Sequence, residues 1–557
     1  MDARMGNGGD RGIAPMTDWR RIEGLQRLLK GEVGAIRKDW GGRIPVALLY
    51  SNTYQVGMSA LGLHALYRLF NAEPDFVAER VFYDDKAKDM PLSMESQRPL
   101  GDFPFIACSM TYELDYFHFV HALQQAGIPP RANQREEDDP IVIMGGPAVT
   151  ANPMPLAPFV DAFCIGEAEP VIVPLIAALR SRFDLSRDDT VDALSHIPGF
   201  YAPARPRLPV ARQWLRNLDA FPTHSEILTR HTEFGDMFLI EIARGCGRGC
   251  RFCLAGYVYR PTRERSLDCI LEQAKAGLVH RKKMGLISAA VSDYSRRDEL
   301  VARLREMGAK ISVSSLRADS LSPALLHALA ESGTRTLTFA PEAGSERLRR
   351  AINKNITEEQ ILQAAALARE AHFPELKLYF MIGLPGETDE DVAELCVLSE
   401  AAGRAFGGKI TLNLSPFVPK AHTPFARSPM ASTETLEARL AAVRARLRSA
   451  GIAVKSDSVA WARVQGVLAR GGAELAAVLE SMSAVSLPAW RDALPAHSLS
   501  EDTYLDAIPR SRPLPWEGVI DSRIADAHLL RESQAAEESR STPPCPPSDC
   551  TRCGVCP

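Results

Sequence analysis

Three cysteines in a glycine-rich loop are the residues most clearly suited to chemistry. Cys246, Cys250 and Cys253 form a Cys-x3-Cys-x2-Cys run. Thiolates ligate soft metals, and a closely spaced run can wrap a single iron–sulfur cube. The intervening glycines, Gly245, Gly247 and Gly249, let the backbone approach the metal without Cβ clashes. Three ligands leave one iron of the cube open, and an open position can bind a substrate or cofactor directly.

A structural zinc site is the competing interpretation of these three cysteines. It would need a fourth ligand from elsewhere in the chain. Zinc knots usually pair two Cys-x2-Cys turns, and nothing near Cys253 completes that pattern. The spacing therefore favours an iron–sulfur cluster.

A second cysteine group closes the chain, with the spacing Cys-x4-Cys-x2-Cys-x2-Cys. Residues 531–557 are polar and proline-rich, so this tail needs a metal or a docking surface to fold. Four thiolates suit a structural zinc ion, and the spacing equally resembles ferredoxin-type ligation of an auxiliary iron–sulfur cluster. The sequence therefore leaves zinc and an iron–sulfur cluster as alternatives for this site, and metal-free thiols are the third. The four ligands are Cys545, Cys550, Cys553 and Cys556.

The distribution of cysteines and charge indicates a cytoplasmic protein. Tight cysteine groups in a large chain without a signal peptide point to metal ligation in a reducing compartment. No apolar stretch is long enough to cross a bilayer. The net charge of −4 gives no overall attraction to nucleic acid or to anionic membranes. Four scattered cysteines read as small buried hydrophobes: Cys108, Cys164, Cys269 and Cys396.

At 557 residues the chain is long enough for several domains. Residues 1–15 are rich in glycine and charge and read as a disordered tail. Residues 40–180 alternate apolar strands with helices, which predicts a doubly wound parallel sheet covered on both faces. Ligands of such sheets bind beyond the carboxyl ends of the strands. The expected strands are Ile44–Tyr50, Phe76–Tyr83, Phe105–Met110, Ile141–Met144 and Ala162–Ile165.

Residues 181–233 read as a linker, and a second strand–helix alternation covers 234–428. Six strand–helix units predict a partial (β/α)6 barrel, whose active site lies at the carboxyl ends of the strands. The three clustered cysteines directly follow the first of these strands. Residues 429–530 read as helical and 531–557 as the metal-binding tail. The expected barrel strands are Met237–Ala243, Leu286–Val291, Ile311–Ser315, Thr336–Phe339, Leu376–Ile382 and Lys409–Leu414.

The loop Cys-x3-Cys-x-aromatic-Cys, with Phe252 in the aromatic position, resembles the signature of radical S-adenosylmethionine (SAM) enzymes. The resemblance implies a [4Fe–4S] cluster on Cys246, Cys250 and Cys253 whose open iron binds SAM. It also implies a one-electron donor of flavodoxin or ferredoxin type, and cleavage of SAM to a 5′-deoxyadenosyl radical. The protein would orient and seal the site while the cofactor supplies the hard chemistry.

The resemblance continues at the strand ends of the barrel. It implies polar contacts to SAM from Ser314, Arg317 and Glu342, and adenine contacts from Met381 and Gly383. An intrabarrel ion pair between Arg317 and Glu342 is the alternative role for those two residues. The Gly-Gly-Glu common in the family after the second strand is replaced here by Ser288-Ala289-Ala290, so Ser288 and backbone carbonyls are expected to substitute.

The first domain resembles the cobalamin-binding domains that precede some radical SAM barrels. Their Asp-x-His-x-x-Gly loop corresponds here to Asn52–Gly57, where Tyr54 replaces the cobalt-ligating histidine. Two interpretations follow: cobalamin bound without a lower protein ligand, or a domain that only packs on the barrel and shapes the substrate cleft. The candidate corrinoid contacts are Asn52, Tyr54, Gly57, Ser109, Gly145 and Gly146.

The whole arrangement resembles an uncharacterised family of radical SAM proteins with an N-terminal B12-binding-like domain. The first functional hypothesis is a cobalamin-linked enzyme that transfers an alkyl or methyl group to an unactivated carbon of an unassigned substrate. The second is an RNA- or protein-modifying enzyme of methylthiotransferase kind, which would need a second cluster. The third, a non-catalytic iron–sulfur scaffold, requires the open iron to be incidental.

Overall fold

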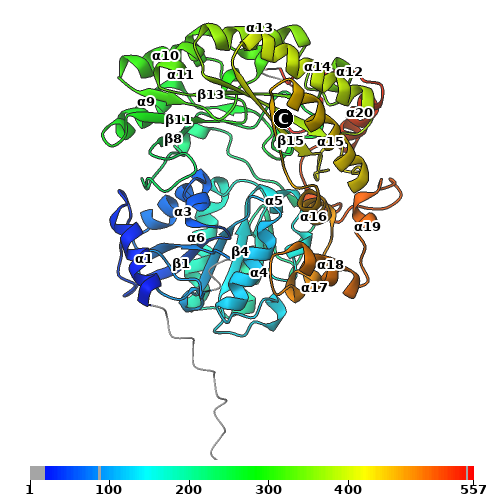
Figure 1. The fold of residues 1–557 in the computed structure, drawn as a ribbon. Helices are drawn as coiled ribbons and strands as arrows, with labels where there is room; N and C mark the ends of the chain where they lie inside the picture. The colour runs from blue at the N-terminus through cyan, green and yellow to red at the C-terminus, as the bar shows by residue number, and fades with distance from the viewer. Residues whose placement is uncertain (1–18, 86–88, 547–549, 557) are drawn as a thin grey trace, which may run out of the picture.

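The computed structural model describes residues 19–85, 89–546 and 550–556. The tail expected over 1–15 lies outside the described residues. An N-terminal α/β domain occupies the lower half of Figure 1 and a barrel-like domain the upper half. Within the described ranges, no helix combines the length and the apolar character that a membrane crossing requires.

The N-terminal sheet has the strand order β2-β1-β3-β4-β5-β6. The first five strands are parallel and β6 is antiparallel to β5, which confirms the doubly wound sheet. Expected and observed strands agree closely, because most are short apolar runs bounded by polar or turn residues; β2 is the exception, since it contains Glu79 and Arg80. The strands are β1 (Ile44–Tyr50), β2 (Phe76–Phe82), β3 (Phe105–Ser109), β4 (Ile141–Gly145), β5 (Ala162–Cys164) and β6 (Phe200–Tyr201).

Helices cover both faces of this sheet, so alternate residues of one strand enter different cores. Ala47 and Leu49 of β1 pack in the same core as Phe117 of α4 (Asp115–Gln125). Val46 and Leu48 pack on the other face, in the core that contains α3 (Leu61–Ala72) and α6 (Ile172–Arg180). Burial on both faces explains why β1 has no polar residue.

The segment 181–233, expected as a linker, contributes structure of its own. It contains α7 (Arg187–Ser195) and supplies β6 as the edge strand of the N-terminal sheet. Its strand β7 (Val210–Ala211) pairs in parallel with β17 (Ile520–Asp521), close to the C-terminal end of the chain. These strands were not predicted, because a strand of two residues is too short to show an alternating pattern and the surrounding sequence is rich in proline.

The barrel domain consists of two parallel sheets joined by the bridge Leu316–Phe339. Together they supply the six strands of the expected partial barrel. A seventh strand, β16, extends the sheet beyond β15 within the region expected to be helical. It is short and polar, so only its partner strand reveals it. The strands are β8 (Phe238–Glu241), β11 (Lys283–Ile287), β12 (Lys310–Ser312), β13 (Thr336–Glu342), β14 (Glu375–Ile382), β15 (Lys409–Pro416) and β16 (Ala453–Ser456).

Helices connect successive barrel strands, as right-handed parallel crossovers require. Two of them, α13 and α14, begin with a complete capping box, at Thr357 and Thr388, which fixes where each helix starts. The connecting helices are α9 (Leu267–Leu278), α10 (Arg297–Glu306), α11 (Pro323–Glu331), α12 (Glu346–Ala351), α13 (Glu358–Glu370), α14 (Asp389–Phe406) and α15 (Thr433–Ser449).

The C-terminal region contacts both domains in turn. After α16 (Val459–Arg470), helices α17 (Leu475–Ser481) and α18 (Leu487–Ala496) lie beside α4 of the N-terminal domain, where the rings of Phe117 and Trp490 are 5.9 Å apart. The chain then returns to the barrel as α20 (Asp526–Glu537), which packs on α12 (Figure 1). This region therefore ties the two domains together.

His64 of α3 links the N-terminal domain to the segment that enters the barrel. Its Nδ1 accepts a hydrogen bond from the Ile227 amide at 3.3 Å, and its Nε2 lies 3.1 Å from the Met58 carbonyl. Burial lowers the pKa of His64 to about 4. The pKa of this imidazole is lower in the folded chain than in the unfolded chain. The folded state is therefore destabilised as the pH falls from about 6.5 toward 4, because the unfolded chain binds the proton first.

We therefore expect the unfolding free energy of His64→Gln to depend less on pH below pH 6.5 than that of the wild type. Between pH 6.5 and 4 the wild type should lose about 3 kcal/mol more unfolding free energy than the variant, measured by urea unfolding across that range. Replacement of the exposed His327 by glutamine is the matched control and should leave the wild-type curve unchanged. Parallel curves for wild type and His64→Gln would contradict this assignment.

Candidate functional site

The three clustered cysteines lie in the loop between β9 (Ala243–Arg244) and α8 (Ala255–Val258), directly beyond β8. Gly245 opens the loop with a φ of 84°, and a Cβ there would lie 2.4 Å from the Tyr259 carbonyl oxygen. Only glycine fits this position. Burial, then the neighbouring thiols of Cys250 and Cys246, raise the pKa of Cys253 to about 12. The thiols are thus mutual neighbours, and a metal must displace their protons on binding.

Two cations face this cluster loop. Arg317, at the carboxyl side of β12, acts electrostatically on Cys246, and Lys354 acts on Cys253. Both cations are buried. Positive charge stabilises thiolates and an anionic cluster. The donor set, three thiols from one loop with cations beside them, therefore fits a [4Fe–4S] cluster.

Arg317 and Glu342 do not pair with each other. Arg317 Nε donates to Asp319 at 2.9 Å, while Glu342 Oε1 lies 3.3 Å from Lys354 Nζ. A link remains, because Arg317 Nη2 donates to the Lys354 carbonyl at 3.0 Å. The intrabarrel ion pair considered from sequence is therefore replaced by two separate pairs beside the cluster loop.

Glu342 has a strained backbone. Its φ is 72°, in the left-handed region that non-glycine residues rarely adopt, and it lies at an irregularity of β13. Such strain persists only where the surroundings enforce it, and it concentrates at functional sites. This observation supports a ligand-binding role for Glu342 that the sequence motif alone implied only by resemblance.

The remaining candidate SAM residues fall into different surroundings. Phe252 and Met381 pack against the same apolar cluster, which contains Ala343 and Leu384. The amide of Gly383 donates to Glu387 Oε2 at 2.6 Å, so it is used within its own turn. Ser314 is exposed beyond β12, and Ser288 lies at a cavity between the two domains. The structure thus brings Phe252 and Met381 together and leaves Ser314 apart.

Arg248, inside the cluster loop, anchors that loop to the neighbouring strand ends. Its guanidinium donates to Asp293 at 2.7 and 2.6 Å and to Asp319 at 3.1 Å. Asp293 follows β11 and Asp319 follows β12. This role of Arg248 was not predicted from the sequence, although acidic residues beyond two successive strands were a signal for it.

Arg244, directly before Gly245, joins the two domains. Its guanidinium donates to Glu167 at 2.8 Å and to Glu169 at 2.9 Å, both from the N-terminal domain, and to Glu241 of β8 at 2.9 Å. Despite the cost of burial, Arg244 and Arg263 hold the pKa of Glu167 below its usual range. Glu167 therefore stays charged, and the contacts of Arg244 fix the domain junction next to the cluster loop.

An apolar cavity of about 540 Å³ lies at this junction. Leu66 and Leu69 of α3 form part of its wall on the N-terminal side, and Gly245, Tyr259 and Ser288 line it on the barrel side. Of the candidate corrinoid residues, the cavity brings together those at the carboxyl ends of β3 and β4, namely Ser109, Gly145 and Gly146.

The other three candidate corrinoid residues make contacts elsewhere. Asn52 Nδ2 donates to Asp115 at 2.8 Å, and the Tyr54 hydroxyl donates to Glu32 at 2.6 Å. A Cβ on Gly57 would lie 2.3 Å from the Phe82 ring. These contacts hold the loop after β1 within the N-terminal domain.

Comparison with known proteins identifies the family. Residues 62–203 match the family model described as radical SAM proteins, N-terminal, and residues 240–398 match the radical SAM superfamily. The uncharacterized protein MJ0966 of Methanocaldococcus jannaschii is 33% identical over 439 residues, which is 78% of this chain and 90% of that protein. The chain belongs to the radical SAM superfamily. This radical SAM protein is therefore an enzyme whose chemistry uses a [4Fe–4S] cluster and SAM.

Two further similarities extend less far. The tRNA-2-methylthio-N(6)-dimethylallyladenosine synthase of Anaplasma phagocytophilum is 26% identical over 39% of this radical SAM chain and 51% of its own length. The chain thus spans about half of that relative. Among solved structures, the methyltransferase TsrM of Kitasatospora setae, with cobalamin and a [4Fe–4S] cluster bound, is similar with a TM-score of 0.49 and 13% identity, covering 69% of this chain and 73% of TsrM.

Arg251, inside the radical SAM cysteine loop, is buried and holds the C-terminal segment. It donates to Glu532 of α20 at 3.0 Å, to the Ala351 carbonyl at 2.7 Å and to the Arg540 carbonyl at 2.9 Å. Removing one partner of a buried ion pair leaves an uncompensated charge.

We expect Arg251→Ala to destabilise the protein by about 3–5 kcal/mol and to loosen the C-terminal tail. Chemical unfolding and limited proteolysis of residues beyond α20 measure the two effects. The exposed pair Arg303–Glu306 is the matched control, and Arg303→Ala should change stability by less than about 1 kcal/mol. Equal stability of the two variants would show that the Arg251 contacts do not hold the tail.

Proposed function

We propose that this radical SAM enzyme transfers an alkyl or methyl group to an unactivated carbon, with cobalamin held in the apolar cavity between its two domains. The single observation that carries this proposal is the position of the cavity. It is built from both domains and reaches Gly245, the residue before Cys246. A cofactor in the cavity would therefore lie beside the cluster loop.

The cavity residues fit a corrinoid that has no lower protein ligand. Tyr54 stands where a cobalt-ligating histidine would stand, and it is engaged with Glu32. Apolar side chains and backbone turns, with few charged groups, are what a large flat organic cofactor requires. Ser109, Gly145 and Gly146 would contact it from the carboxyl ends of β3 and β4.

When bound, the cluster and SAM supply a 5′-deoxyadenosyl radical, and cobalamin supplies a carrier for the transferred group. The chain's own residues prepare the site. Cys246, Cys250 and Cys253 would hold the cluster while Arg317 and Lys354 balance its charge. Phe252 and Met381 would shape the adenine side, and the apolar wall formed by α3 excludes water, which limits side reactions.

A low-potential electron donor must act with the enzyme, since radical SAM chemistry begins with one electron. We propose a donor of flavodoxin or ferredoxin type in a reducing cytoplasm. Two tight groups of free thiols among the described residues support that compartment.

Methylthiotransferase activity is the second candidate, supported by the position of the tail. The two cysteines of the N-terminal domain, Cys108 and Cys164, are buried in β3 and β5; they belong to different cores, and both line the cavity between the domains. Two thiols fall short of the ligands that a second cluster needs. The tail cysteines do lie against the barrel, so only they could serve this activity.

Anaerobic reconstitution followed by spectroscopy and product analysis tests the proposal. We expect a corrinoid absorption spectrum in protein supplied with cobalamin, together with S-adenosylhomocysteine and 5′-deoxyadenosine from SAM. A protein that forms 5′-deoxyadenosine but binds no corrinoid would overturn the cobalamin assignment. A methylthio product would favour the second candidate.

A further inference from the structure

The C-terminal tail docks directly on the radical SAM cysteine loop. The Cys545 amide donates to the Gly247 carbonyl at 2.7 Å. A Cβ on Gly247 would lie 3.3 Å from the Cys545 Cβ, so the absence of a side chain permits this approach. Gly247 directly follows Cys246. One backbone hydrogen bond therefore links two cysteine groups that are far apart in sequence.

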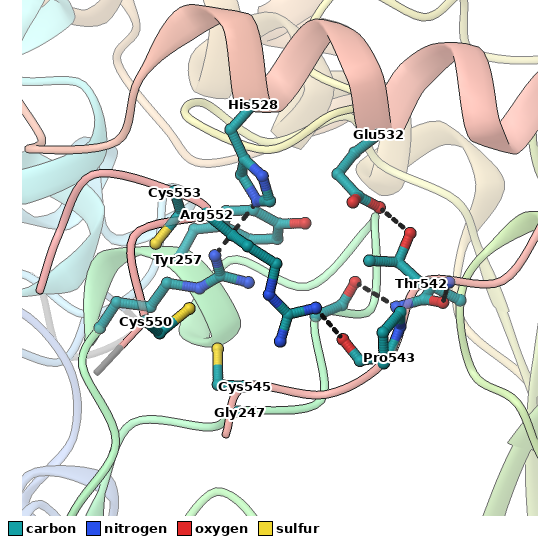
Figure 2. Close-up of a pocket in the computed structure, with 13 residues that line it drawn as sticks. Gly247, Tyr257, His528, Glu532, Thr542, Pro543, Cys545, Cys550, Arg552 and Cys553 are labelled. Atoms are coloured by element: carbon teal, nitrogen blue, oxygen red, sulfur yellow. Dashed lines mark hydrogen bonds between the residues drawn. The ribbon is translucent and has the colours of Figure 1, made fainter. Parts of the chain in front are cut away.

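The tail cysteines lie around shared cavities. Cys545, Cys550 and Cys553 line one pocket, and Cys556 joins them along a second. Cys550 and Cys553 are buried, and Figure 2 shows their sulfur atoms together with that of Cys545 on one side of a pocket that Gly247 also lines. Such a convergence of thiols in a segment with little apolar surface is typical of a metal site.

Cations and the barrel surround this thiol group. Arg260, stacked over Tyr257 at 4.5 Å, acts electrostatically on Cys545. The tail itself is held by the Thr542 amide, which donates to Asn353 at 2.8 Å, and by the Ala525 amide, which donates to the Cys553 carbonyl at 2.8 Å. The thiols are thus fixed against the barrel on both sides of the segment.

All four tail cysteines also line a cavity of about 1060 Å³. Its opposite wall includes the segment Ser292–Glu299, which follows β11. The cavity gives the thiol group room for a cluster and a face open to an external protein. An electron-transfer centre needs such access to a donor protein, whereas a purely structural metal site does not.

We propose that Cys545, Cys550, Cys553 and Cys556 hold a second iron–sulfur cluster that relays electrons to the cluster on Cys246, Cys250 and Cys253. The inference rests on the proposed first cluster. Four thiolates saturate a [4Fe–4S] cube and leave no iron open for sulfur transfer, so the second cluster is an electron carrier. The Cys550-x2-Cys553-x2-Cys556 portion matches the Cys-x2-Cys-x2-Cys run of bacterial ferredoxins, whereas zinc at this position would be redox-inert.

The relay step balances as a single-electron exchange. The tail cluster passes from the 1+ to the 2+ state while the first cluster passes from 2+ to 1+. A low-potential one-electron donor protein of flavodoxin or ferredoxin class then returns the tail cluster to 1+. The contact between the Cys545 amide and the Gly247 carbonyl provides a direct route from the tail to Cys246.

Metal analysis of serine variants tests the site. In the full-length reconstituted protein, Cys550→Ser and Cys556→Ser should each lose about four iron and four sulfide per chain and one paramagnetic signal of the reduced protein. Cys269→Ser, on α9 and away from both groups, is the control and should keep wild-type iron. Zinc in the wild-type tail, or unchanged iron in both tail variants, would overturn the proposal.

The choice of reductant tests the relay. With a flavodoxin and its reductase as donor, the tail variants should form 5′-deoxyadenosine about tenfold more slowly or worse, and with dithionite at the wild-type rate. Equal loss with both reductants, or no loss with either, would overturn the relay. Failure of the first-cluster assignment is distinguishable, because it would abolish SAM cleavage by the wild type with dithionite as well.

Discussion

Cys250→Ala is expected to abolish SAM cleavage and to remove about four iron atoms per chain, while the tail keeps its metal. Cys250 is buried between the other two ligands, and a cube cannot stay bound on Cys246 and Cys253 alone. Without the cluster no electron reaches SAM. We therefore expect formation of 5′-deoxyadenosine to fall by about 10³-fold or more with any reductant.

Iron, sulfide and product analysis of the anaerobically reconstituted variant measures this effect. Cys396→Ala is the matched control, because Cys396 is buried in α14 and faces the barrel core rather than the loop. It should keep both the iron and the activity. Unchanged iron in Cys250→Ala would show that the cluster assignment is wrong, and zinc in its place would favour the structural interpretation.

Gly62→Trp is expected to block the cavity between the domains. Gly62 lies in the first turn of α3 and lines the cavity, and no atom of the described chain lies within 4 Å of a Cβ placed there. Gly62 is exposed at the rim of the cavity, so an indole can be accommodated there without a backbone clash. We expect corrinoid affinity to fall by about 100-fold or more, since the ring would obstruct the cavity at this rim.

Gly62→Ala is the matched control for this experiment. Alanine at a helical position is more favourable than glycine by up to about 1 kcal/mol, so this variant should be slightly more stable and should bind cobalamin normally. Titration of cobalamin followed by absorption, with iron content measured in parallel, separates the two variants. Wild-type corrinoid affinity in Gly62→Trp, with the iron retained, would mean that cobalamin does not bind in this cavity.

Sequence alone determined the features that depend on near neighbours along the chain. The strand β1 was predicted with its observed bounds because its apolar run is interrupted at both ends. The loop around Cys246, Cys250 and Cys253 was predicted because ligand spacing is a local property. The six barrel strands followed from the same alternation of apolar runs and helices, although the second was expected at Leu286–Val291 and lies at Lys283–Ile287.

Only the tertiary structure decided which distant groups meet. Arg317 and Glu342 could have paired with each other across the barrel, but Arg317 pairs with Asp319, two residues further on, and Glu342 pairs with Lys354. The strand β16 has too few apolar residues to be recognised without its neighbour β15. Short polar segments and surface charges carry no periodic signal of their own.

The contact between the two cysteine groups best illustrates the difference between what the sequence predicts and what the tertiary structure adds. Each group was recognisable as a metal site from spacing alone, and the distance between them in sequence concealed any relation. The return of α20 to the barrel, held by Glu532 on Arg251, brings Cys545 to Gly247. Local chemistry is encoded in the sequence spacing, whereas contact between sites depends on packing over the whole chain.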